Sequence, residues 1–82
     1  MLKTVAVKID EIYIPAERRK ELDQQKVDAL ADTIMEGTDE RPIHVRKGKD
    51  RYVLVKGVNR LEARKALGDV TIEAYIVSAK QH

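Results

Sequence analysis

Apolar and polar residues alternate along the first part of the chain. In Thr4–Ile9 every second residue is a β-branched apolar one, and the residues between are Thr, Ala and Lys. A period of two places the apolar side chains on one face and predicts a strand. Ile12–Ile14 is a short extended piece that ends at Pro15, because the residue before a proline avoids the α region.

The apolar period then changes to that of a helix. Over Gln24–Glu36 the apolar residues recur at i, i+3, i+4, i+7 and i+8, which makes one apolar stripe; they are Val27, Leu30, Ala31, Ile34 and Met35. Asp23 is placed to cap the helix N-terminus, and Gly37 occupies the position that favours a left-handed backbone after the C-terminus.

The second half of the chain alternates shorter elements. Two apolar segments flanking a glycine turn predict a hairpin, a helix then ends at a glycine, and a final strand follows. The segments are Arg41–Arg46 and Asp50–Lys56 around Lys47–Lys49, a helix from Asn59 to about Leu67 ending at Gly68, and a strand over Ile72–Val77. The prediction is an α+β fold with a small mixed sheet in the order β-α-β-β-α-β, formed as a single domain over residues 1–82.

Composition narrows the class of protein. The 82 residues hold no cysteine, which excludes a thiol nucleophile, a redox pair and a thiolate zinc site. The N-terminus has no apolar core of signal-peptide length, and no apolar run approaches the ~18 residues of a membrane span. We therefore expect a cytoplasmic protein without a membrane segment. His44 is expected to be an exposed strand residue, and with the terminal His82 it does not make a metal site.

Charge is segregated along the chain although the net charge is only +2. Glu17–Glu40 has four basic and eight acidic residues, a balance of −4, whereas Arg41–Ala66 has nine basic and two acidic residues, a balance of +7. The basic block Arg41–Ala66 favours an anionic partner: a nucleotide, a nucleic-acid phosphate or another acidic ligand. The alternative is a solvated surface with lysines and arginines on strand edges. The acidic helix opposite a basic block would also suit self-association of an interaction module.

One turn combines several features of a phosphate site. Gly57 follows a predicted strand and leads directly into a helix, where free backbone N–H groups and the helix dipole favour an anion. Arg60 adds a planar fork of donors suited to phosphate, and Arg64 lies one helical turn later on the same face. A glycine and an arginine at this spacing are common, so the motif alone is a weak signal.

The first predicted helix carries a second candidate group. Lys26, Ala29 and Thr33 share a face that flanks the apolar stripe, so a lysine and a hydroxyl could both reach an anion lying across the helix. The alternative is a solvated lysine and a threonine whose hydroxyl bonds back to its own helix.

Taken together, these segments resemble the ParB/sulfiredoxin superfamily. The resemblance covers nearly the whole chain in the right order, through Leu22–Ile34, Pro42–Val45, Gly57–Arg60, Leu67–Gly68 and Ile72–Ala74. It implies a small mixed sheet that binds nucleotide or phosphate between the glycine turn and the first long helix. In the sulfiredoxin branch, a helix lysine and threonine and the arginine after the turn contact ATP phosphates. The matching residues are Lys26, Thr33 and Arg60.

This sequence also departs from the sulfiredoxin pattern. Ala29 stands where that branch has a helix serine, Val58 replaces the catalytic cysteine, and Asn59 replaces the following histidine. Valine has no nucleophile, so the resemblance excludes a sulfiredoxin reductase. Asn59 can still donate a hydrogen bond to a phosphate oxygen.

The ParB branch is similar at the same turn, which there holds CTP, while a separate helix-turn-helix domain recognises DNA. Some relatives phosphorylate free serine, for which Glu17 would be the nearest candidate base. The resemblance therefore implies a module that binds ATP or CTP, with Mg²⁺ as the accompanying ion, and that could act as a weak NTPase or phosphotransferase. DNA-binding or partition-accessory activity and a non-catalytic interaction module remain the alternatives. The expected binding residues are Lys26, Thr33, Gly57, Asn59, Arg60 and Arg64.

Overall fold

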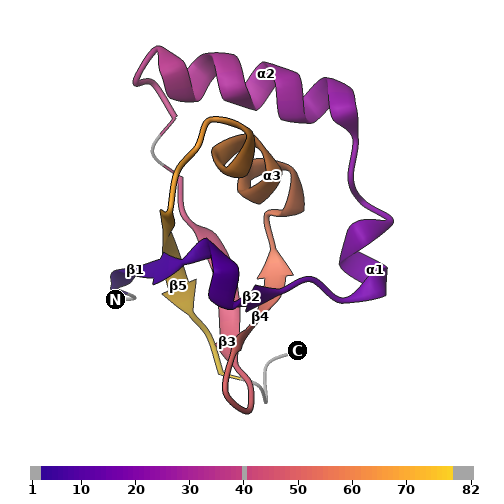
Figure 1. Ribbon diagram of the computed structural model, residues 1–82, viewed down its shortest axis with the longest axis vertical. Coiled ribbons are helices and arrows are strands. Elements are labelled where there is room, and N and C mark those ends of the chain that lie inside the picture. The colour runs from indigo at the N-terminus through magenta and orange to yellow at the C-terminus, as the bar shows by residue number, and fades with distance from the viewer. Residues whose placement is uncertain (1–2, 40, 79–82) are drawn as a thin grey trace.

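A five-stranded mixed sheet organises the molecule in the computed structural model, which describes residues 3–39 and 41–78. The strands lie in the order β1-β5-β3-β4-β2 (Figure 1). The β1/β5 and β3/β4 pairs are antiparallel, whereas β5/β3 and β4/β2 are parallel. The strands are β1 (Thr4–Lys8), β2 (Ile12–Tyr13), β3 (Ile43–Lys47), β4 (Tyr52–Lys56) and β5 (Thr71–Ile76).

The helices form two further layers on one side of this sheet. Helix α3 (Val58–Ala66) follows β4 and lies next to the sheet, and α2 (Gln24–Met35) runs across α3 on the side away from it (Figure 1). The short helix α1 (Ala16–Arg19) lies beside β4, and a single 3₁₀ turn, η1 (Ile9–Glu11), connects β1 to β2. Helix α3 is therefore held between the sheet and α2, with its N-terminus beside the end of β4.

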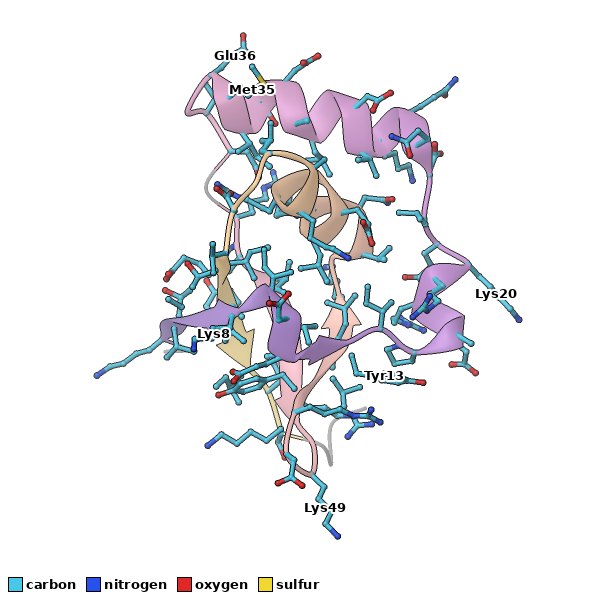
Figure 2. The ribbon with its side chains drawn as sticks, viewed as in Figure 1. Lys8, Tyr13, Lys20, Met35, Glu36 and Lys49 are labelled. Atoms are coloured by element: carbon cyan, nitrogen blue, oxygen red, sulfur yellow. The ribbon has the colours of Figure 1, made fainter. Side chains whose placement is uncertain are left out.

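The core lies between the sheet and α3. Three α3 residues, Val58, Leu61 and Ala63, are at most 3% exposed. Val58 and Leu61 belong to one cluster with apolar side chains from four strands and from η1. By contrast, Val27 is the only buried residue of α2, and Met35 at its C-terminal end is 71% exposed and projects away from the core (Figure 2). Because burial of apolar area is the main stabilising term, α3 is the helix on which the fold depends.

The predicted helix boundaries are confirmed within one residue. Asp23 caps α2 by accepting a hydrogen bond from the Gln25 backbone N–H at 2.9 Å. After α2, Gly37 has φ +76°, and its N–H donates to the Ile34 carbonyl at 3.0 Å. Gly68 has φ +85° and ends α3 in the same way, with its N–H donating to the Lys65 carbonyl. Local sequence rules located both helices because caps act through neighbouring residues.

The predicted element order was incomplete at its N-terminal end. Ile12–Tyr13 is a true strand, because it pairs in parallel with Tyr52–Val53 of β4, and the segment Ala16–Arg19 is helical rather than a loop. The mixed α+β class is confirmed, but the order is β-β-α-α-β-β-α-β. A two-residue strand is too short to show a hydrophobic period. It is recognised only by its pairing with residues of β4 that lie about forty positions later in the chain.

The β3–β4 hairpin also differs from the prediction in its turn. Asp50, predicted to begin the second strand, has φ +64° and lies in the connection, which is closed by a 2.7 Å hydrogen bond from the Gly48 N–H to the Arg51 carbonyl. Lys49 projects from the tip of this hairpin, at the end of the molecule opposite the helices (Figure 2). In the described part of the chain, no helix is long and apolar enough to cross a membrane.

A candidate phosphate-binding cleft at the Gly57 turn

Gly57 connects β4 directly to α3 in a conformation that other residues rarely adopt. Its backbone has φ +109° and ψ +33°. A Cβ atom built on Gly57 would lie 2.7 Å from Cγ2 and 3.1 Å from Cβ of Ile43, which is completely buried in β3. Both the left-handed backbone and the close approach of β3 therefore require glycine here.

The turn exposes donors at the start of α3. The first intrahelical bond runs from the Leu61 N–H to the Gly57 carbonyl at 2.9 Å, and Gly57 has no side chain with which to cap the helix. The N–H groups of Val58, Asn59 and Arg60 precede that bond, so the helix itself supplies no acceptor for them. Together with the helix dipole they form an environment suited to an anion.

These donors open into a cleft of about 450 Å³. The cleft is lined by the start of β3, the end of β4, the first turn of α3, and single residues from β5, α2 and the segment before α2: Glu21, Leu30, Arg41, Pro42, His44, Lys56, Gly57, Val58, Asn59, Arg60 and Tyr75. Among the residues that the structure describes, the charged lining is Arg41, Lys56 and Arg60 against the carboxylate of Glu21. The volume lies within the usual range of small-molecule sites.

Arg60 lines the cleft and is held by a carboxylate from the loop after α2. Its Nε donates to Oδ2 of Asp39 at 2.8 Å, and its Nη2 donates to Oδ1 at 3.1 Å. The two side chains are 16% and 10% exposed, respectively. The hydrogen bonds from Arg60 hold the pKa of Asp39 below its ordinary value of 3.8, and the charges of Arg60, Arg64 and Arg41 add to this while burial opposes it.

The side chain of Asn59 connects α3 to the segment before α2. Its Oδ1 accepts the backbone N–H of Asp23 at 2.8 Å, and its Nδ2 donates to the Glu21 carbonyl at 3.3 Å. The amide therefore fixes the entry to α2 against the first turn of α3. The main contribution of this side chain is therefore to shape the cleft. Only its second Nδ2 proton can still be donated to a ligand.

Lys26 and Thr33 lie in a neighbouring hollow rather than in the cleft itself. This hollow, of about 320 Å³, is lined by Lys26, Ala29, Leu30, Thr33 and Asn59, and it shares Leu30 and Asn59 with the cleft. The Thr33 hydroxyl donates to the Leu30 carbonyl at 2.9 Å. The threonine therefore bonds back to its own helix, and in this arrangement its oxygen can only accept.

Arg64 does not line the cleft. Its Nη1 donates to Oδ2 of Asp69 at 3.2 Å, and its Nη2 donates to the carbonyl oxygen of Asp39 at 3.4 Å. Other members of the basic block Arg41–Ala66 are also engaged: Lys65 lies 3.8 Å from Oε1 of Glu62, and the Arg51 guanidinium lies 3.9 Å from the ring centre of Tyr13. The positive balance counted along the sequence is therefore partly neutralised in space.

Several residues that line the cleft or lie beside it were missed by sequence reasoning. Asp39 and Glu21 gave no signal, because neither stands at a recognisable spacing from Gly57. His44, expected to be exposed, is half-buried and lies edge-to-face with Tyr75 at 5.1 Å between ring centres, since β3 and β5 are neighbours in register. A carboxylate at the cleft comes from Glu21, whereas the side chain of Glu17 is 83% exposed and does not line it.

Two chemical expectations can be set against the geometry. Val58, at the position of the sulfiredoxin cysteine, is 3% exposed and belongs to the core cluster, so no side-chain nucleophile stands at this position. Within residues 3–39 and 41–78, no three histidine, cysteine, aspartate or glutamate residues are grouped to hold a metal ion.

Comparison with known proteins places this geometry in a family. The model of the ParB N-terminal domain matches residues 2–82. A probable chromosome-partitioning protein ParB of Campylobacter jejuni is 36% identical over 81 residues, which are 98% of this chain but 29% of that protein. The chain thus spans under a third of this curated relative.

Solved structures share the same fold. Sulfiredoxin from Arabidopsis thaliana is 31% identical with a TM-score of 0.81, covering 94% of this chain and 86% of its own. A C-terminally truncated ParB from Caulobacter crescentus, complexed with CTP-γ-S, is 21% identical with a TM-score of 0.76 over 93% and 44% of the two chains. A free serine kinase in complex with ADP is 22% identical with a TM-score of 0.79 over 92% and 31%.

Proposed function

The chain belongs to the ParB N-terminal domain family, and from this membership we propose that it binds a nucleoside triphosphate with the phosphates in the cleft at Gly57. The observation that carries the proposal is the convergence of the α3 N-terminal amides with Arg41, Lys56 and Arg60 in one cleft. Backbone donors, a helix dipole and cationic side chains together are the usual means of holding phosphate.

The nucleotides named with the relatives agree with this chemistry. One structure of the same fold holds a CTP analogue and another holds ADP, so ATP and CTP are the ligands to test first. In the proposed complex the phosphates lie against the α3 amides and Arg60, and Lys26 reaches them from the neighbouring hollow. Thr33 would contribute only as an acceptor, for example to a hydroxyl or amino group of the ligand.

Binding is better supported than bond cleavage. Within the described part of the chain, the carboxylate that lines the cleft is that of Glu21, and its Oε2 lies 3.3 Å from Nη1 of Arg18. This carboxylate therefore already has a cationic partner in α1. Nucleotide binding is therefore the conclusion, and phosphorus-31 spectra of ATP and CTP incubated with the protein would report hydrolysis directly.

The test is a titration of the labelled protein with ATP, ADP and CTP, each with Mg²⁺, followed by amide chemical shifts. Amides from Gly57 to Arg64 should shift, whereas Gly48 in the β3–β4 hairpin serves as an internal reference. Shifts confined to the hairpin, or none at millimolar nucleotide, would contradict the proposal.

Arg60→Ala should weaken nucleotide binding by about 1.5–3 kcal/mol, the range of hydrogen bonds to a charged group. This corresponds to a dissociation constant roughly ten- to a hundredfold higher. Arg51→Ala is the matched control, because it removes the same charge from a site on Tyr13 outside the cleft lining. Equal losses in the two variants would show that only general electrostatic attraction is at work.

A further inference from the structure

We propose that Asp39 is a positioning residue that orients the guanidinium of Arg60 toward the phosphates of a bound nucleotide; this inference rests on the proposed function. Asp39 lies outside the lining of the cleft, yet both of its carboxylate oxygens bind Arg60, at 2.8 and 3.1 Å. Its side chain is 10% exposed, so the pair is largely shielded from water. Asp39 therefore acts on a ligand through Arg60 and not by contact.

The hydrogen-bond pattern determines which edge of the guanidinium remains available. A guanidinium has five N–H groups, and Asp39 takes the Nε–H and one N–H of Nη2. Among the described residues, no acceptor is found for the two protons of Nη1 or for the second proton of Nη2. Those protons lie along the edge of the fork that can bind a phosphate in a bidentate manner. Because Arg60 lines the cleft, this edge is the part of the side chain that a ligand can use.

Asp39 is itself held from two directions. Arg64, one turn after Arg60 on α3, donates from Nη2 to the Asp39 carbonyl oxygen at 3.4 Å. On the α2 side, the preceding residue Thr38 donates from both its backbone N–H and its hydroxyl to the Thr33 carbonyl, at 3.0 and 3.1 Å. The backbone that carries Asp39 is thus anchored to both helices. From this fixed backbone the carboxylate can orient an arginine whose side chain would otherwise sample many rotamers.

Asp39 favours binding by orienting Arg60, but its negative charge works against binding. The charge weakens the electrostatic attraction between the site and an anion. The carboxylate is separated from the ligand position by the guanidinium, whereas the phosphate would contact the guanidinium directly. Since electrostatic energy falls with distance and contact hydrogen bonds depend on geometry, orientation should outweigh repulsion. The two effects predict opposite signs for removal of the charge, so one variant distinguishes them.

The experiment compares Asp39→Asn with Asp69→Asn in the full chain. Asp69 also pairs with an arginine of α3, at 3.2 Å from Arg64, but that arginine lies outside the cleft lining. Dissociation constants for ATP and CTP with Mg²⁺ should rise about tenfold in Asp39→Asn and stay within about twofold in Asp69→Asn. In the nucleotide-free protein, the Arg60 Nε–H resonance should be protected from solvent exchange in the wild type and should lose that protection only in Asp39→Asn.

A double-mutant cycle separates positioning from a merely structural role. If Asp39 acts through Arg60, Asp39→Asn should have almost no further effect on binding in an Arg60→Ala background. Asp39→Glu provides a variant that keeps the buried charge balance and is therefore expected to fold. It displaces the fork by one methylene and should raise the dissociation constant about threefold without moving the unfolding midpoint.

Three results would overturn the inference. Tighter binding by Asp39→Asn would show that the main effect of the carboxylate is to repel the anion. Unchanged affinity in both Asp39→Asn and Asp39→Glu would show that Asp39 has no positioning role. An equal loss in the Arg60→Ala background would show that Asp39 acts on folding alone. Failure of the wild type itself to bind either nucleotide is a different result, which refutes the proposed function and the inference with it.

Discussion

Arg60 and Asp39 illustrate what individual residues contribute to this domain. The arginine could be singled out from the sequence because it stands three positions after a glycine that opens a helix. Its partner could not, since 21 residues separate the two and a loop carboxylate has no characteristic spacing. In space the pair is nearly buried, and a charge left there without its partner would be costly. The proposed binding role and the stability of the fold therefore depend on the same ion pair.

The lowered pKa of Asp39 makes a prediction for acid stability. Because the folded-state pKa lies below the unfolded value of 3.8, the unfolded state binds more protons between these two values. The contribution of Asp39 is therefore present above about pH 4 and is lost as the pH falls through the folded-state pKa. Urea denaturation at several pH values below 5 should show a steeper loss of stability in the wild type than in Asp39→Asn.

The stabilities of the wild type and of Asp39→Asn are compared first at neutral pH. At neutral pH, Asp39→Asn should already be less stable than the wild type, because Arg60 then lacks its charged partner. The stability curves of the two proteins should approach each other as the solution becomes more acidic. Parallel curves down to pH 2 would show that Asp39 is not the titrating group.

At the scale of elements, the connection from β4 to α3 decides where the cleft lies. The helix is placed by three buried side chains, and its first turn is placed by Gly57 against Ile43 of β3. Asn59 then ties this turn to the start of α2, across 36 residues, through the backbone N–H of Asp23. The donors of α3 are thus fixed by contacts with a strand on one side and a helix entry on the other.

Gly57→Ala should destabilise the fold by about 2–4 kcal/mol, because it adds left-handed strain and forces a methyl group against Ile43. Gly68→Ala is the matched control: it has a similar positive φ of +85°, but a Cβ there meets no atom within 4 Å. It should cost only the backbone strain, about 1 kcal/mol. Thermal or urea unfolding of both variants gives the comparison, and equal losses would mean that the contact with Ile43 is relieved at little cost.

At the scale of the whole molecule, charge along the chain and charge in space differ. The segments that carry the opposite balances fold onto each other, since Arg60 and Arg64 of the basic block bind Asp39 of the acidic segment. At the cleft, the described lining keeps a local excess of cations. This arrangement suits a small polyanion such as a triphosphate.

A ligand that binds only the folded state must stabilise the whole domain. Nucleotide at ten times its dissociation constant should add about 1.4 kcal/mol. For a domain of this size that corresponds to a rise of roughly 6–11 °C in the unfolding midpoint. Differential scanning fluorimetry with an added dye, or calorimetry, would measure the shift. Arg60→Ala at the same nucleotide concentration should show much less, and equal shifts in both proteins would place the binding elsewhere.

Much of the architecture was available from sequence alone. The two long helices, their caps at Asp23 and Gly37, and the strand–glycine–helix turn at Gly57 all follow from neighbouring residues. Side-chain period, capping and backbone freedom act over a few positions, so they can be recognised without coordinates. The α+β class followed from the order of these elements, whereas the two-residue strand β2 escaped because it has no period of its own.

The composition of the cleft was decided by tertiary structure. Parallel pairing of β3 with β5 sets Tyr75 beside His44. Packing of α2 on α3 places Lys26 and Thr33 in a neighbouring hollow, which shares Leu30 and Asn59 with the cleft. The sequence determined that backbone N–H donors would lie at the start of α3, because a glycine before the helix has no side chain to cap its first N–H groups. Only folding could choose the carboxylate that holds Arg60, because that choice depends on which loop the chain brings back to the helix.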